Sequence, residues 1–158
     1  MDIQNRREWF GKVAWLGALG ALLPSSASSQ TTSSRRYVKN PGTQARAYSP
    51  AVITQGGTTI WLAGQTASMD ESGRVLDFEG QVRQLFSQFA KTLQEAGGKL
   101  SDIVTMTVFI TDIRNAEQFL RIRRETFGDN FPASALIEIS GLVPPQALIE
   151  IQAVAVVG

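Results

Sequence analysis

The run from Ile103 to Ile110, IVTMTVFI, constrains the fold more than any other part of this chain. Its residues are β-branched or apolar, which favours a strand over a helix. A strand without a polar face has to be covered on both sides, as the central strand of a sheet is. The rest of the chain must therefore provide neighbouring strands and a covering layer.

Helical periodicity is found on both sides of this run. A first helix is predicted from about Glu79 to the pair Gly97 and Gly98, which ends it. Its apolar face consists of Val82, Leu85, Phe86, Phe89 and Leu93. A second, shorter helix is predicted from about Asn115 to Phe127, closed by Gly128. Two amphipathic helices can supply the covering layer.

The other segments have the composition of strands. The sequence AVITQGGTTIWLAGQT is interpreted as two short strands joined in a hairpin at residues 55–57, because its paired glycines permit positive φ angles. Two final strands are predicted from Ala133 to Ile139 and from Ala147 to Val156. The order β-β-α-β-α-β-β indicates an α+β fold, in which two helices pack on one face of a mixed β-sheet.

Side chains of a strand point alternately to the two faces of a sheet, so each final strand presents two sets of residues. We expect Ala135, Ile137 and Ile139 to face the helices together with the apolar residues of the last strand. The opposite face then carries Ser134, Leu136, Glu138, Leu148, Glu150 and Gln152. This set is half apolar and half polar, which is typical of an oligomer interface that contains a cleft.

Residues 1–30 have the layout of an export signal. Arg6 and Arg7 resemble the arginine pair of the twin-arginine signal, which directs folded proteins across the bacterial inner membrane. The apolar run from Val13 to Leu23 has 11 residues, whereas a helix that spans a bilayer needs roughly 20. The sequence therefore predicts an exported protein, periplasmic or secreted, without a stable membrane anchor. Residues 31–45 are interpreted as a flexible leader, and residues 46–158 as the domain.

The charges and the missing residue types exclude several classes of function. Three of the 15 basic and two of the 14 acidic side chains lie in residues 1–30, which leaves 12 of each in the remainder. Such a neutral domain lacks the basic excess typical of nucleic-acid-binding proteins, so no nucleic-acid partner is expected. The sequence contains no His and no Cys, which excludes Ser-His-Asp triads, thiol nucleophiles and nearly all zinc sites. We therefore expect no metal and no cofactor.

Five segments, in this order, resemble the RidA (YjgF) family of reactive-intermediate deaminases. They are AYSPAV around Tyr48, AGQT from Ala63, VTMTVFITD from Val104, FPASALIEI from Phe131, and ALIEIQAVAV from Ala147. The resemblance extends from AYSPAV to the C-terminus. It implies a chorismate-mutase-like fold and a barrel-like homotrimer with a small-molecule cleft between subunits.

Deaminating members of this family hydrolyse 2-imino or enamine acids to 2-keto acids and ammonia. In their PARS motif the arginine grips the substrate carboxylate, and a glutamate in the last strand positions the attacking water. The resemblance places this glutamate at Glu150, whereas Ser134 occupies the position of the arginine. Leu136 replaces a small or thiol residue and Leu120 replaces an asparagine, so the implied cleft is more apolar. One hydroxyl cannot imitate a guanidinium fork, so we expect weak or no activity on simple 2-imino acids.

Several candidate residues also have a structural interpretation. Glu150 is either the catalytic group that positions water or an interface glutamate. Tyr48 either lines the cleft or covers the edge of the sheet. Backbone amides near Ala63 and Gly64 either donate to a substrate oxygen or serve close packing. Ser134 is a passive replacement rather than a nucleophile, because no histidine can activate it.

Some members of the family have been described as ribonucleases, and the run RIRR from Arg121 to Arg124 invites that interpretation. On a helix these arginines spread over more than one face, with Glu117 and Glu125 close enough to pair. A solvated, salt-bridged surface is the favoured interpretation.

The leading hypothesis is a RidA-like small-molecule hydrolase that acts on an imine, an enamine or a related activated carbonyl in an intersubunit cleft. Glu150 would position the attacking water. The alternative is a non-catalytic ligand-binding or protein-protective module on the same trimeric scaffold. Substitution of Glu150 separates the two hypotheses, because a binding module keeps its ligand affinity while an enzyme loses rate.

Overall fold

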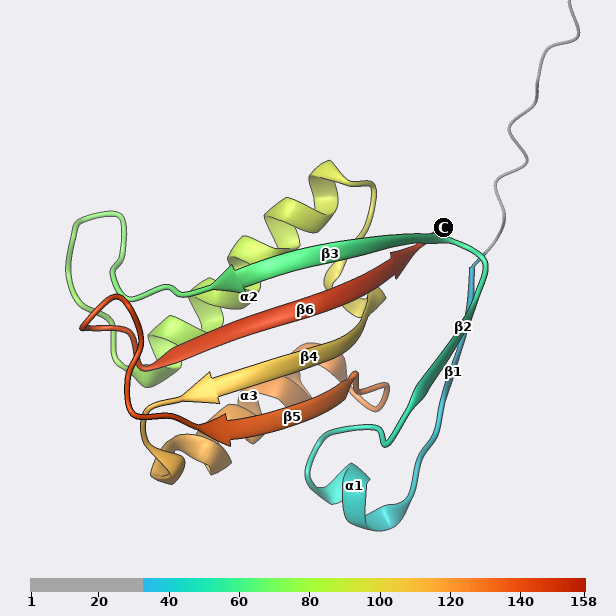
Figure 1. Cartoon of the computed structure of the whole chain (residues 1–158), viewed down its shortest axis with the longest axis horizontal. Coiled ribbons are helices and arrows are strands. Elements are labelled where there is room, and N and C mark those ends of the chain that lie inside the picture. The colour runs from blue at the N-terminus through green and yellow to red at the C-terminus, as the bar shows by residue number, and fades with distance from the viewer. Residues whose placement is uncertain (1–32) are drawn as a thin grey trace, which may run out of the picture.

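The computed structural model describes residues 33–158, which form one four-stranded sheet, one two-stranded sheet and a layer of helices (Figure 1). The N-terminal export signal predicted for residues 1–30 lies outside the described residues. The elements in chain order are β1 (Ser34–Tyr37), α1 (Pro41–Ala45), β2 (Val52–Gln55), β3 (Thr58–Gln65), α2 (Phe78–Glu95), β4 (Ile103–Ile110), α3 (Ala116–Phe127), β5 (Ala133–Glu138) and β6 (Ile149–Val157). Two short 3-10 turns, η1 (Leu100–Asp102) and η2 (Ile113–Asn115), lie on either side of β4.

The larger sheet has the strand order β3-β6-β4-β5. β6 pairs antiparallel with both β3 and β4, while β4 and β5 are parallel, so the sheet is mixed as predicted. The run Ile103–Ile110 is an internal strand, with partners on both of its edges. β5 lies at an edge of this sheet.

α2 and α3 cover one face of this sheet, as the sequence predicts (Figure 1). α2 begins after Asp77, whose carboxylate accepts a hydrogen bond of 2.8 Å from the Gly80 amide, a typical N-cap. It ends at Glu95, and Gly97, two residues beyond that end, has a φ of 77° that glycine adopts without strain. The helices meet through Phe86, whose ring packs edge-on against that of Phe127 at 5.6 Å between centroids.

The predicted hairpin and the predicted flexible leader are wrong. β2 pairs with β1 and β3 pairs with β6, so the two strands on either side of Gly56 and Gly57 belong to different sheets. Both glycines have positive φ, but they turn the chain from one sheet into the other. The segment expected to be a leader forms β1 and α1 instead, because β2 gives β1 a partner and Asn40 caps α1 by accepting from the Thr43 amide.

The assignment of faces is correct for β6 and wrong for β5. Residues paired across a sheet share a face, and Val108 lies between Leu136 of β5 and Ile151 of β6. Val108 and Ile151 are buried beneath the helices, so Leu136 also faces the helices. Ser134 shares this face, because its partner is the buried Met106. The remaining residues of β5, which alternate with these and include Ile137, point to the opposite side of the sheet. This side, which α2 and α3 do not cover, is here called the open face.

The open face of the larger sheet carries Glu150 and Gln152 of β6 together with exposed apolar residues. Trp61 of β3 is 81% exposed and Ile137 of β5 is 41% exposed. The expectation of one half-apolar, half-polar sheet face is confirmed, although β5 contributes a different set of residues to it. None of the helices within residues 33–158 combines the length and the hydrophobicity that a transmembrane span requires.

Candidate functional site

Glu150 lies half-buried on the open face of the sheet, against the backbone of Gly64. β6 brings the glutamate beside β3, where the pairing register shifts between Leu62 and Gln65. A side chain at residue 64 would overlap the Oε1 atom of Glu150, so glycine leaves the space that the carboxylate occupies. Ala63 and Gly64 are exposed beside it. The predicted grouping of Glu150 with the Ala63–Gly64 segment is therefore present in the structure.

Three other predicted substrate-binding residues, Leu120, Ser134 and Leu136, gather on the opposite face, between α3 and β5. Ser134 and Leu136 project from β5 toward the helices, and Leu120 of α3 packs half-buried against the same core. Within one chain, these residues and Glu150 are thus separated by the sheet. The expectation that Ser134, Leu136 and Glu150 share one face is wrong, because β5 is an edge strand whose two sets of side chains are similarly apolar.

Arg123 of α3 is the residue that sequence reasoning missed. Its Nη1 atom donates a hydrogen bond of 2.8 Å to the Ser134 hydroxyl, and its Nη2 atom donates one of 2.8 Å to the Arg46 carbonyl. The Arg123 side chain is only 2% exposed, and its guanidinium lies 5.0 Å from the centre of the Phe119 ring. A guanidinium therefore reaches position 134 from the neighbouring helix, although the strand itself supplies none.

Burial changes the ionisation of this arginine. The loss of water around the Arg123 guanidinium, and then the nearby positive charge of Arg124, lower the pKa of Arg123 to about 10. Arg123 is still charged at neutral pH. Its Nε atom is buried without a hydrogen-bond partner among the described residues. The side chain thus places a buried positive charge directly behind Ser134.

The segment that precedes β2 closes over the start of β5. Ser49 forms a parallel bridge with Ala133, and its amide donates to the Pro132 carbonyl at 3.1 Å. Ala47 is buried and has a φ of 54°, the left-handed conformation that is uncommon for a residue with a side chain. The adjacent Tyr48 is half-buried. Its role, as a residue that lines the cleft or as one that covers the edge of the sheet, stays a prediction.

The basic run at residues 121–124 is only partly a solvated surface. Arg121 forms ion pairs of 2.6 Å with Glu79 and 2.9 Å with Glu125, as a salt-bridged surface does. Arg123 is buried, and Arg124 donates to the Ala45 carbonyl. The prediction is confirmed for Arg121 and is wrong for Arg123, because the helix turns that side chain into the protein.

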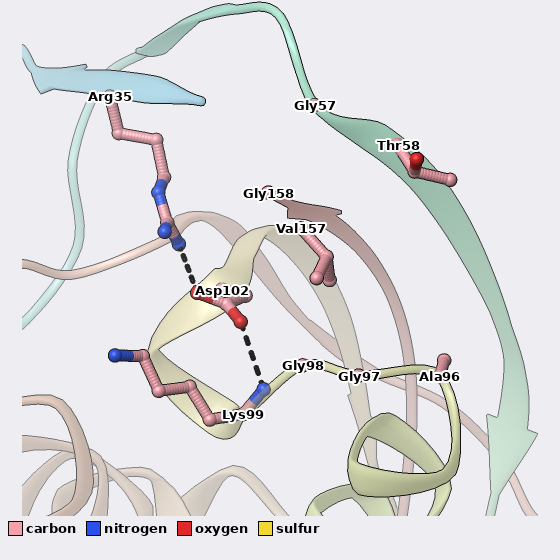
Figure 2. A pocket seen from close by; sticks show the side chains of 10 residues that line it. All are labelled: Arg35, Gly57, Thr58, Ala96, Gly97, Gly98, Lys99, Asp102, Val157 and Gly158. Atoms are coloured by element: carbon pink, nitrogen blue, oxygen red, sulfur yellow. Dashed lines mark hydrogen bonds and ion pairs between the residues drawn. The ribbon is translucent and has the colours of Figure 1, made fainter. Parts of the chain in front are cut away.

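A separate pocket of about 750 Å³ lies where β1 meets the end of α2 (Figure 2). One of its lining residues is Asp102, which pairs with Arg35 at 2.7 Å and accepts from the Lys99 amide at 2.9 Å. Both carboxylate oxygens of Asp102 are thus engaged by the protein itself. The pair ties β1 to the main domain, and we assign it a structural role.

The comparisons with known proteins agree with this architecture. The family model described as Endoribonuclease L-PSP matches residues 38–157. The chain belongs to the RidA (YjgF) family. A RutC family protein from Pyrococcus abyssi is 33% identical over 110 residues, covering 68% of this chain and 84% of that protein. A RutC family protein from Aquifex aeolicus is 35% identical over 112 residues, covering 69% of this chain and 87% of that protein.

Solved structures of RidA-family proteins have the same fold. The Rid-family protein YyfB from Yersinia pestis, of unknown function, superposes with a TM-score of 0.67 at 25% identity, covering 78% of this chain and 98% of that one. RidA from an Antarctic Psychrobacter species gives a TM-score of 0.58 at 26% identity, covering 77% of this chain and 94% of that one. The fold expected from the sequence resemblance is therefore confirmed.

Proposed function

We propose that this RidA-family protein is a small-molecule hydrolase that acts at a C=N bond or a related activated carbonyl. The observation that carries the proposal is the half-buried Glu150 carboxylate held over Gly64 on the open face of the sheet. A carboxylate in such a place can orient a water molecule and accept its proton as the water attacks the electrophilic carbon. Protonation of the nitrogen then lets ammonia or an amine leave.

We propose further that the working cleft lies between copies of the chain in a homotrimer. Two features support this assembly: the sheet separates Glu150 from Ser134 within one chain, and the open face exposes Trp61 and Ile137. A second copy that covers this face would bury these apolar side chains and exclude water from the Glu150 carboxylate.

We also propose that activity on simple 2-imino acids is weak. Ser134 offers one hydroxyl where a bidentate clamp needs two parallel donors. The two terminal nitrogens of Arg123 are already engaged by Ser134 and by the Arg46 carbonyl. A ligand carboxylate therefore meets no free guanidinium fork at this position.

The test is release of ammonia from freshly generated 2-iminopropanoate and from its neutral methyl ester. We expect a larger rate above background with the ester, and Glu150→Gln should reduce this rate by about 100-fold or more, the usual contribution of a positioned acid or base. A variant that keeps the wild-type rate would contradict the catalytic role of Glu150. Unchanged ligand affinity without any Glu150-dependent rate would instead favour the ligand-binding module.

Cleavage of RNA is not favoured by the environment of the basic run. Arg121 is occupied by Glu79 and Glu125, Arg123 is buried, and Arg124 is bound to a backbone carbonyl. Phosphate contacts need arginines that can reach the nucleic-acid backbone. We therefore propose a small molecule as the substrate.

We propose that the protein acts after export through the twin-arginine route, as Arg6, Arg7 and the apolar run that follows suggest. Cell fractionation of the native chain and of an Arg6→Lys/Arg7→Lys variant tests this location. The native chain should accumulate outside the cytoplasm and the variant within it. Equal distribution of the two proteins would overturn the proposal.

A further inference from the structure

Gln81 of α2 is a polar residue in the middle of a buried apolar helix face. It is 0% exposed and precedes the buried Leu85 by four residues, at helical spacing. A buried amide group is unfavourable unless it forms hydrogen bonds. The Nε2 atom of Gln81 donates to the Leu76 carbonyl at 3.1 Å and to the Gln146 carbonyl at 2.9 Å. Its Oε1 atom accepts from the Leu148 amide at 2.9 Å.

The partners of Gln81 belong to two loops. Residues 66–77 connect β3 with α2, and residues 139–148 connect β5 with β6. Both loops are longer than the usual connection of about 4 to 6 residues. Figure 1 shows them at the same end of the larger sheet, where β3 ends and β6 begins. One side chain of the core therefore ties both loops to the first turn of α2.

The loop before β6 leads directly to the proposed catalytic glutamate. Leu148, whose amide donates to Gln81, precedes Glu150 by two residues. The Leu148 carbonyl accepts from the Thr111 amide at 3.1 Å, which ties the same residue to the end of β4. Glu150 itself pairs with β4, whereas the pairing of β6 with β3 begins at Ile151. Gln81 thus adds support at the part of β6 that β3 does not yet hold.

The loop after β3 leads back to Gly64. The Leu76 carbonyl accepts from Gln81, and the Leu76 amide donates to the Ser68 carbonyl at 3.0 Å. Ser68 follows Gly64 by four residues, and the Glu150 carboxylate lies against Gly64. Hydrogen bonds therefore connect Gln81 with the two segments that meet in the contact between Glu150 and Gly64.

We propose that Gln81 is a positioning residue for Glu150. It fixes the beginning of β6 and the loop that follows β3, and thereby holds the Glu150 carboxylate over Gly64. This role rests on the proposed function, in which Glu150 orients the attacking water. Gln81 is fully buried and does not touch the substrate, so its effect on the reaction is indirect. Substitution of Gln81 should therefore lower kcat and leave KM nearly unchanged, because it displaces a group that acts in the transition state.

The test compares two substitutions of glutamine by methionine on α2, assayed with the methyl ester of 2-iminopropanoate. Gln81→Met keeps the length of the side chain and loses its hydrogen bonds. It should lower kcat about tenfold or more and leave KM within about twofold, since a misplacement of about 1 Å can cost about 100-fold in rate. The matched control is Gln84→Met, because Gln84 donates at 3.1 Å to the Met69 carbonyl, in the loop after β3 rather than at the beginning of β6. The control should keep both constants of the wild type.

The amide resonance of Gly64 detects a displacement of Glu150 without any turnover. Because Glu150 contacts Gly64, Glu150→Gln should shift this resonance in NMR spectra of the full chain prepared with isotope-labelled glycine. Gln81→Met should shift it as well, whereas Gln84→Met should not. A wild-type kcat or an unshifted Gly64 resonance in folded Gln81→Met would overturn the proposal. Equal effects of the two methionine variants would overturn it too.

The same variants distinguish this proposal from the function on which it rests. If Glu150→Gln keeps the wild-type rate, hydrolysis by Glu150 is refuted, and the Gly64 resonance alone then decides whether Gln81 positions the carboxylate. If Gln81→Met fails to fold, Gln81→Glu takes its place with the same expected results, because its carboxyl group can donate to at most one of the two carbonyls. If neither variant folds, Gln81 supports the fold as a whole and the proposal is overturned.

Discussion

Serine at position 134 is explained by its contact with Arg123, because each side chain satisfies a polar group of the other. The hydroxyl accepts from the buried guanidinium at 2.8 Å, and no carboxylate in residues 33–158 pairs with that guanidinium. The two positions are therefore energetically coupled, and neither can change without an effect on the other. An arginine introduced at position 134 would meet the positive charge that is already there.

We predict that Ser134→Arg lowers the free energy of unfolding by about 3 kcal/mol, because it places a second guanidinium beside a buried one. The double variant Ser134→Arg/Arg123→Gln should recover most of this loss and should hydrolyse 2-iminopropanoate faster than the wild type. Urea denaturation and ammonia release measure the two effects. Wild-type stability of the single variant would show that the two guanidinium groups do not meet.

We predict that Gly64→Ala lowers the hydrolytic rate by at least tenfold while the protein remains folded. The new methyl group would overlap the end of the Glu150 side chain, which can swing away at little cost in stability but then leaves its place on the sheet. The control is Gly141→Ala, since a side chain at Gly141 meets nothing within 4 Å. A rate equal to that of the control would remove the support for a catalytic Glu150.

The candidate residues could be located from the sequence more easily than their contacts. Glu150 and the segment at Ala63 and Gly64 were predicted, and the structure places them together. Arg123 was missed because it was grouped with the exposed arginines around it. Helical spacing could have revealed it, since Arg123 follows Phe119 by four residues and precedes Phe127 by four, and both of these aromatic residues face the core.

At the scale of elements, helices and internal strands were predicted well and the edges of the sheet were not. α2 and α3 have an apolar face that periodicity identifies, and β4 is apolar enough to require an internal position. β5 alternates between two sets that are both partly apolar, so its sequence does not specify which set faces the helices. The pairing of β1 with β2 depends on contacts between distant segments, which local composition does not encode.

The ion pairs between α2 and α3 give a prediction for acid stability. Hydrogen bonds from Arg83, Arg121 and Gln118 lower the pKa of Glu79 from 4.5 to about 2. The Glu79 carboxylate therefore binds a proton less readily in the folded state than in the unfolded state. Its contribution to the stability of the folded state is fully present above pH 4.5 and is lost as the pH falls to about 2.

Accordingly, Glu79→Gln should lower the melting temperature at pH 6 and should flatten its fall between pH 4.5 and pH 2. The effect should shrink in high salt, because the pairs are exposed to solvent. Thermal melts of the wild type, Glu79→Gln and Glu117→Gln check this, since Glu117 takes part in none of the ion pairs found in residues 33–158. If the melting temperatures of the wild type and of Glu79→Gln fell in parallel with pH, the role assigned to Glu79 would be refuted.

At the scale of the whole molecule, the two faces of the larger sheet differ in a way that a single chain does not explain. The helices bury one face, whereas the open face carries Trp61, Ile137 and the half-buried Glu150. A hollow of about 370 Å³ lies beside Trp61 and Gln152 on this face. A partner that inserts a side chain there would cover the exposed indole, as the proposed homotrimer requires.

We therefore predict that Trp61→Arg dissociates the assembly and abolishes Glu150-dependent hydrolysis together. A buried tryptophan at the centre of an interface contributes about 2 kcal/mol or more, so the dissociation constant should rise about 30-fold or more. Val143→Arg is the matched control, because Val143 is 96% exposed and lies in the loop between β5 and β6 rather than in a strand of the sheet. Light scattering should show trimers for the wild type and the control, and monomers for Trp61→Arg at the same concentration. A monomeric Trp61→Arg protein with full hydrolytic rate would place the whole reaction within one chain, and the intersubunit cleft would then have no role in the chemistry.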